Sequence, residues 1–201
     1  MTSVRRGRDS EAVRVASPDH PAGEAGRLHP SSPPPARRVS PMRMADLDAV
    51  MAVEALAFEV PWTRGNFVDS IAAGHAGVVL TGPQGELLGY FVAMEGVDEL
   101  HLLNLTVHPA HQRRGHARFL LDELAALAQR LHARELWLEV RQSNLRAQAV
   151  YRRHGFVQVG VRKAYYPLPP GSQGREDAVV MSLKLPWSDD LPPQEVPHGL
   201  E

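Results

Sequence analysis

The stretch from His108 to Leu121 constrains the fold of this chain more than any other. A strand-like run from Leu102 to Val107 precedes it and ends at His108–Pro109, where proline stops strand pairing and turns the chain. Beyond Gly115, apolar residues recur at three- and four-residue steps, which predicts a helix with one apolar face. These residues are Ala117, Leu120, Leu121, Leu124, Leu127 and Leu131. The sequence therefore predicts a strand, a turn and an amphipathic helix in direct succession.

The start of that helix is suited to an anion. Backbone N–H groups of a first helical turn have no partner within the helix, and the positive end of the helix dipole lies beside them. Gly115 and Ala117 keep side-chain bulk away from an approaching ligand. Arg113, Arg114 and Arg118 can neutralise phosphate charge, although such arginines are equally typical of a solvated helix face. The backbone amides of the loop are therefore the stronger prediction.

The remaining elements predict a mixed α/β domain. Strands are expected from Val39 and at about 77–81, 87–94, 100–107, 135–140, 156–165 and 178–185, and helices from Asp46, from Thr63 to Ala73 and from Asn144 to His154. Asp46 can cap the first helix, whose inward face is expected to carry Leu47, Val50, Met51 and Ala55. The second half alternates strands and helices, which predicts neighbouring parallel strands that bind ligands at their carboxyl ends.

Two motifs resemble a known family. Gln112 to Ala117 reads Q-R-R-G-H-A and resembles the Q/R-x-x-G-x-G/A pyrophosphate loop of the GNAT superfamily of acetyl-CoA-dependent N-acetyltransferases. Asn144, Ala147, Tyr151 and Gly155–Phe156 match the spacing N-x-x-A-x-x-x-Y-x-x-x-G-F of the same superfamily. The resemblance implies a GNAT fold, with a central twisted mixed sheet of about seven strands flanked by helices.

Narrower segments resemble one group within that superfamily, the RimI-like acetyltransferases of ribosomal-protein N-termini. They are W-L-E-V-R-Q-S-N from Trp137 to Asn144, Y-Y-P from Tyr165 to Pro167, and R-E-D-A from Arg175 to Ala178. The likeness runs from about Val39 to Leu185. In the loop, RimI-like enzymes usually have G-L-G where this chain has Gly115–His116–Ala117.

The resemblance implies that acetyl-CoA is the acetyl donor and assigns residues to it. The main chain of the strand that ends at Val107 would hold the pantetheine arm of acetyl-CoA. The loop after it and the start of the following helix would hold the pyrophosphate. These residues are Leu105, Thr106, Val107, Arg113, Arg114, Gly115, His116, Ala117, Arg118 and Asn144. From the side chains alone, the first three read as strand core, and an asparagine after Ser143 is a routine helix cap.

Two residues are candidates for proton transfer. Glu139 alternates with apolar residues on a strand and lies near its carboxyl end, which suits a general base, and the resemblance implies that role. The alternative is an ion pair with Arg141 or Arg146. Tyr151 would protonate the departing thiolate according to the resemblance, whereas its apolar neighbours are typical of a packing tyrosine.

The substrate side is predicted from an elbow and a tyrosine pair. Pro61 breaks the first helix, so an aromatic-rich elbow at Pro61–Trp62 projects before the second one. The resemblance implies that this elbow and Tyr165–Tyr166 bind a protein N-terminus, with the N-terminal alanine of ribosomal small-subunit protein eighteen as first choice. The alternative for Trp62 is a place in the core.

Composition limits the classes of function. With 201 residues, 43% hydrophobic residues and a formal charge of −1, the chain reads as one globular domain with no overall electrostatic preference for nucleic acid or a membrane. Without cysteine it has no thiolate metal site and no cysteine nucleophile, and it fits the reducing cytoplasm. His108 and His111 have no obvious third ligand, so no metal is expected.

Both ends differ in composition from the middle. Residues 1–37 contain no aromatic residue and many prolines and charges, which predicts a disordered tail, either inert or used for docking. Residues 187–201 predict a second flexible tail, so the acetyltransferase domain is expected at 38–186. Two rivals to a protein N-terminal acetyltransferase stay open: an acetyltransferase of a small amine, such as a polyamine or an antibiotic, and a catalytically silent acyl-CoA-binding module.

Overall fold

The computed structural model describes residues 37–169 and 171–186. Apart from Arg37, the two tails predicted at 1–37 and 187–201 lie outside the described residues. No helix in the described part of the chain is long and apolar enough to cross a membrane.

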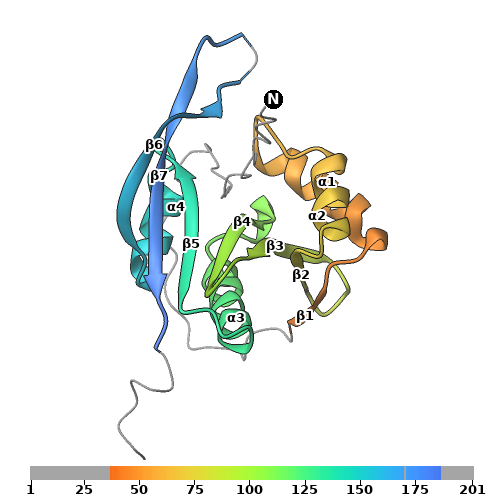
Figure 1. Ribbon diagram of the computed structural model, residues 1–201. Coiled ribbons are helices and arrows are strands. Elements are labelled where there is room, and N and C mark those ends of the chain that lie inside the picture. The colour runs from red at the N-terminus through yellow and green to blue at the C-terminus, as the bar shows by residue number, and fades with distance from the viewer. Residues whose placement is uncertain (1–36, 170, 187–201) are drawn as a thin grey trace, which may run out of the picture.

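The described residues form a seven-stranded mixed sheet with helices on both faces (Figure 1), which confirms the predicted fold class. The strands are β1 (Arg38–Pro41), β2 (Ala76–Thr81), β3 (Leu87–Glu95), β4 (Glu99–Val107), β5 (Glu135–Arg141), β6 (Val157–Pro167) and β7 (Arg175–Lys184). The helices are α1 (Leu47–Ala57), α2 (Arg64–Ala72), α3 (His116–Arg130) and α4 (Leu145–His154), with short 3-10 turns at Met44–Asp46 and Pro109–His111.

The strand order is β1-β2-β3-β4-β5-β7-β6, and only β4 and β5 pair in parallel. The prediction of neighbouring parallel strands is therefore right for β4–β5 and wrong for β5–β6, because β7 lies between them. The exposure of the strands explains this order. Ala178, Val179 and Met181 of β7 are buried and gain from a neighbour on each side, whereas β6 is mostly exposed and suits the sheet edge.

The two parallel strands separate toward their carboxyl ends. Glu99–Leu102 of β4 pair with Glu135–Leu138 of β5, and no later residue of β4 pairs with β5. At the same point β4 has a bulge, because Val92 pairs with Asn104 and Ala93 with Leu102. Figure 1 shows β4 and β5 diverging. The last residues of β4 therefore leave main-chain groups without a strand on the β5 side.

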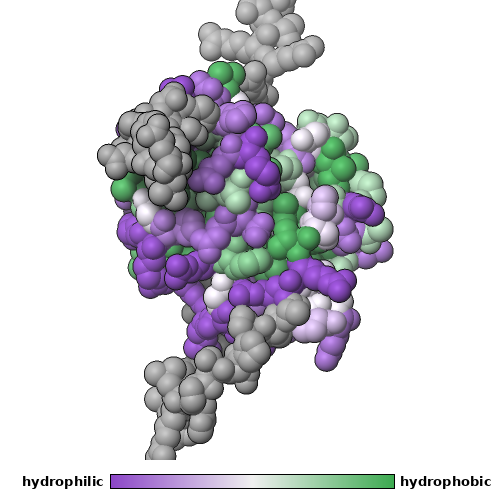
Figure 2. Space-filling model, turned by 90° about the horizontal axis from the view of Figure 1, so that it is seen from below, coloured by the Kyte–Doolittle hydropathy of each residue, from purple (hydrophilic) through white to green (hydrophobic). Residues whose placement is uncertain are grey.

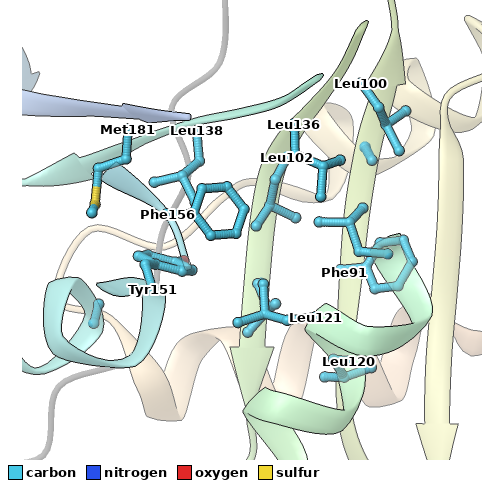
Figure 3. Packing of buried hydrophobic residues seen from close by; sticks show 14 of the residues in the cluster. Phe91, Leu100, Leu102, Leu120, Leu121, Leu136, Leu138, Tyr151, Phe156 and Met181 are labelled. Carbon is cyan, nitrogen blue, oxygen red and sulfur yellow. The ribbon is translucent and has the colours of Figure 1, made fainter. Parts of the chain in front are cut away.

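Two hydrophobic clusters hold the layers together. One lies between the sheet and α3 and α4, and Figure 3 shows Leu120 and Leu121 of α3 turned toward Phe91 and Leu102. The other lies on the opposite face, under α1 and α2, and contains Phe67 and Tyr90. Figure 2 shows the molecular surface from below. It is largely hydrophilic, and hydrophobic patches lie near the middle of this view and toward its right side.

The first helix differs from its prediction in two ways. Asp46 precedes α1, but its Oδ2 accepts a hydrogen bond from the backbone N–H of Arg43 at 2.7 Å and does not cap α1. Ala55 is exposed, and Glu54 is fully buried in its place. At about 100° per residue, the buried positions 47, 50, 53, 54 and 57 lie on one side of the helix and position 55 lies on the other.

Candidate active site

The loop before α3 has the backbone shape of an anion site. Arg113 (φ 63°) and Gly115 (φ 80°) both lie in the left-handed region, a conformation that turns successive N–H groups toward one concavity. Few non-glycine residues adopt it, and those that do are often found at functional sites. Gln112 fixes the base of the loop, because its Nε2 donates to the carbonyl oxygen of Val107 at 3.3 Å. The loop thus joins the end of β4 to the N-terminus of α3.

A pocket of about 670 Å³ opens at this loop, between α3 and α4. It is lined by Val107, Gln112, Arg113, Gly115, His116, Ala117, Arg118, Leu121, Arg146, Val150, Arg153 and His154. Four of these residues are arginines and none is acidic, so the pocket suits a large anionic ligand with an apolar part.

The predicted cofactor residues divide between this pocket and its surroundings. Val107, Arg113, Gly115, His116, Ala117 and Arg118 line the pocket. Arg114 is exposed and Leu105 and Thr106 are fully buried, and none of the three lines it. The Oδ1 of Asn144 accepts from the backbone N–H of Ala147 at 3.0 Å, so this side chain caps α4.

Sequence reasoning missed the share of α4 in the pocket. Arg146, Val150 and Arg153 follow one another at steps of four and three residues, so they lie along one side of the helix. The spacing of these residues could have been read from the sequence. It would have indicated that α4 adds basic residues to the pocket, opposite Arg118 of α3.

His116 occupies the first position of α3 and is buried. Burial lowers the pKa of its imidazole, and the positive charges of Arg37, His111 and Arg114 lower it further. The guanidinium of Arg37 lies 3.3 Å from the imidazole Nδ1. The lowered pKa favours the neutral form of the His116 imidazole, so the positive charge of the pocket comes from its arginines.

Replacing Gly115 with alanine is expected to weaken acetyl-CoA binding about tenfold. An added Cβ meets no protein atom within 4 Å, so the cost of about 1–2 kcal/mol comes from the left-handed backbone. Gly85→Ala is a matched control, because Gly85 has φ 83° and equally open surroundings but lies in the β2–β3 turn. The unliganded loop of Gly115→Ala can relieve this cost by leaving the left-handed region, and ligand binding must then restore it, so thermal unfolding of the unliganded variant should show no greater loss of stability than Gly85→Ala. Calorimetry should show weaker binding only for Gly115→Ala, and equal affinities would contradict the loop assignment.

Tyr151 lies on α4 inside the first cluster, beside Phe156 and on the side where Leu138 and Met181 pack (Figure 3). Its side chain is fully buried, and its hydroxyl has no hydrogen-bond partner among the described residues. Burial raises the pKa of this phenol far above its ordinary value. The hydroxyl therefore keeps its proton, and Tyr151 lies behind the residues that line the pocket rather than among them.

Glu139 lies on β5 with its side chain 13% exposed. Its Oε1 accepts from Arg162 Nη1 at 2.7 Å, so its ion-pair partner is on β6 and is neither Arg141 nor Arg146. The two side chains meet across β7, because Val180 pairs with both Glu139 and Gly160. The guanidinium of Arg162 also stacks on Tyr165, 4.5 Å from the ring centre.

The tyrosine pair connects the two proton-transfer candidates. Tyr166 is buried, and its hydroxyl donates to the carbonyl oxygen of Glu139 at 2.8 Å. Burial raises the pKa of Tyr166 well above its ordinary value, and the nearby Glu139, Tyr151 and Tyr165 raise it further, whereas Arg141 lowers it. Glu139, Tyr151 and Tyr165 thus each lie within electrostatic range of Tyr166.

The predicted elbow is present, with its two residues in different environments. Pro61 is exposed, and Trp62 is 3% exposed and packs edge-to-face on Phe67 at 5.1 Å between ring centres. The side chain of Trp62 is therefore part of the second cluster, as the alternative reading expected. A substrate role for this elbow stays a prediction that concerns Pro61 and the main chain.

No group of three histidine or acidic side chains within residues 37–169 and 171–186 is placed to hold a metal ion.

A mixed sheet that opens between two parallel strands, beside a left-handed anion loop and a pocket with four arginines, defines an α/β protein with a site for a large anionic ligand. The chain belongs to the acetyltransferase (GNAT) family, which it matches over residues 47–156.

Curated relatives extend the likeness over most of the chain. The [ribosomal protein bS18]-alanine N-acetyltransferase of Haemophilus ducreyi is 39% identical over 140 residues, which are 70% of this chain and 94% of the relative. The enzyme of the same name from Escherichia coli is 33% identical over 147 residues, 73% of this chain and 97% of the relative. A crystal structure of the ribosomal-protein-alanine N-acetyltransferase from Escherichia coli superposes with a TM-score of 0.67 at 33% identity, covering 74% of this chain and 94% of that one.

Proposed function

We propose that this acetyltransferase moves the acetyl group of acetyl-CoA onto the N-terminal α-amine of a protein, and that its substrate is the N-terminal alanine of ribosomal protein bS18. The observation that carries the substrate assignment is the 39% identity to an enzyme of that name over 94% of its length. With a ribosomal protein as its substrate, the enzyme would act in the cytoplasm.

The pocket residues fit the donor. The N–H groups of the Arg113–Gly115 loop would bind its diphosphate, and Arg113 and Arg118 would neutralise the charge. The free main-chain edge of β4 at Leu105–Val107 would hydrogen-bond the amide-containing arm, as an added strand would. This arrangement would direct the thioester toward Tyr151 and Glu139.

Glu139 would accept the proton that the attacking amine loses. A protein α-amine has a pKa of about 8, against about 10.4 for lysine, so about a tenth of it is free base at pH 7 and a weak base suffices. As the amine nitrogen bonds to the acetyl carbon, the carbon–sulfur bond breaks. Tyr151 would then donate its hydroxyl proton to the leaving thiolate, and the charge that develops on the sulfur would draw the proton from the phenol.

Mass spectrometry of bS18 incubated with the protein and acetyl-CoA tests the proposal. We expect one acetyl group on the N-terminal alanine and none on a sample whose N-terminus is already blocked. A competition between an alanine-starting peptide and small amines such as spermidine tests substrate class. Equal or faster acetylation of the small amine would overturn the peptide assignment, and binding of acetyl-CoA without any transfer would indicate a silent binding module.

A further inference from the structure

Glu54 is a fully buried acidic side chain on the inward face of α1. It lies at the base of the second hydrophobic cluster, where an aliphatic residue would continue the apolar stripe of the helix. A buried carboxylate costs several kcal/mol unless its oxygens are hydrogen-bonded. The surroundings of Glu54 supply those bonds from three different elements.

The carboxyl oxygens of Glu54 accept from the elbow and from two strands. Oε1 accepts from the backbone N–H of Trp62 at 2.8 Å, and Oε2 accepts from the hydroxyl of Tyr90 on β3. The Nδ2 of Asn104 lies 3.4 Å from both oxygens, and Thr106 Oγ1 lies 3.5 Å from Oε2. Thr106 also donates to Asn104 Oδ1 at 2.8 Å. A single carboxyl group therefore joins α1 to the elbow, β3 and β4.

These contacts join the two sides of the proposed reaction. Trp62 follows Pro61, the exposed residue of the elbow that is predicted to contact the peptide substrate. Thr106 lies in the β4 segment that holds the acetyl donor in that proposal. The donors in these contacts include a main-chain N–H that no side-chain rotation can redirect, so the position of the elbow depends on an acceptor at Glu54 Oε1.

We propose that Glu54 is a positioning residue, which fixes the Pro61–Trp62 elbow at a set distance from the Leu105–Val107 segment of β4. The proposal rests on the proposed function, because it concerns the alignment of a peptide amine with the thioester. Glu54 itself touches neither substrate. Its acceptor oxygen, rather than its charge, carries the effect.

Three variants separate this role from simple packing. Glu54→Met keeps a long unbranched side chain and removes both acceptors. Glu54→Gln retains an acceptor for the N–H of Trp62 and can donate to the hydroxyls of Tyr90 and Thr106. Tyr90→Phe removes a donor from the same carboxyl group without touching the elbow, and is the matched control.

We expect Glu54→Met to raise KM for the peptide about tenfold, since a displaced elbow would bind the peptide more weakly by about 1.4 kcal/mol. The kcat value should change less than about threefold, and the Kd for acetyl-CoA less than about twofold. Glu54→Gln should restore KM to within about threefold of the unmodified protein, and Tyr90→Phe should leave KM nearly unchanged. Steady-state kinetics and calorimetry on folded samples, checked by near-UV circular dichroism, give these numbers.

If Glu54→Met does not fold, Glu54→Asp is measured instead. The aspartate variant keeps the charge, and its side chain is one methylene shorter, so its carboxyl oxygen lies farther from the N–H of Trp62. It should raise the peptide KM as well. A folded Met or Asp variant with unchanged peptide KM would overturn the proposal, as would a Gln variant as impaired as the Met variant. Failure of the unmodified protein to acetylate any peptide would instead refute the proposed function.

Discussion

Tyr151→Phe is expected to abolish most acetyl transfer while leaving the folded protein at least as stable as before. The hydroxyl of Tyr151 is buried and has no partner among the described residues, and such a group costs about 1–3 kcal/mol. Phenylalanine removes that cost and also removes the proposed proton donor. We expect kcat to fall on the order of one hundredfold, a typical effect of losing a general acid.

Tyr166→Phe provides the matched control for stability. Its hydroxyl donates to the carbonyl oxygen of Glu139 at 2.8 Å, so its removal leaves a buried acceptor unpaired and should cost about 1 kcal/mol. Thermal unfolding should therefore give a higher or equal Tm for Tyr151→Phe and a lower Tm for Tyr166→Phe. Calorimetry should give an unchanged Kd for acetyl-CoA with Tyr151→Phe. A Tyr151→Phe variant with normal kcat would show that this tyrosine only packs.

Glu139→Gln is expected to lower kcat by on the order of one hundredfold or more, because the amide cannot accept the proton of the amine. The substitution also breaks the ion pair with Arg162, whose atoms are 2.7 Å apart. Arg162→Gln breaks the same ion pair and keeps the carboxylate, so it should lose far less activity. Single-turnover rates with saturating acetyl-CoA and peptide measure both variants, and equal losses would assign the effect to the ion pair.

The elements with local patterns were predictable from the sequence. The apolar steps from Ala117 to Leu131 predicted α3, and Gly115 marked its start, because both signals depend on residues close in the chain. The hairpin strands β2–β4 were predictable for the same reason. The order of β5, β7 and β6 was not, because it depends on which of two later strands has more apolar surface to bury.

The site shows the same division between local and distant contacts. The anion loop is a continuous segment, so its residues were visible as a motif. Glu139 was found as a candidate, but its partner Arg162 lies on another strand and reaches it across β7. Glu54 was missed because a charged residue on an apolar stripe looks like a solvated position until its four contacting groups are brought together by folding. The aromatic ring of Trp62 suited both core and cleft, and the sequence held nothing to separate the two.

The position of β7 in the sheet determines when the sheet can be completed during synthesis of the chain. Among the described strands β7 leaves the ribosome last, yet it lies between β5 and β6, which emerge before it. A nascent chain that already carries the complete anion loop still has no strand to hold Arg162 beside Glu139. The half of the sheet formed by β5, β7 and β6 can therefore pair only after residues 175–184 have left the ribosome.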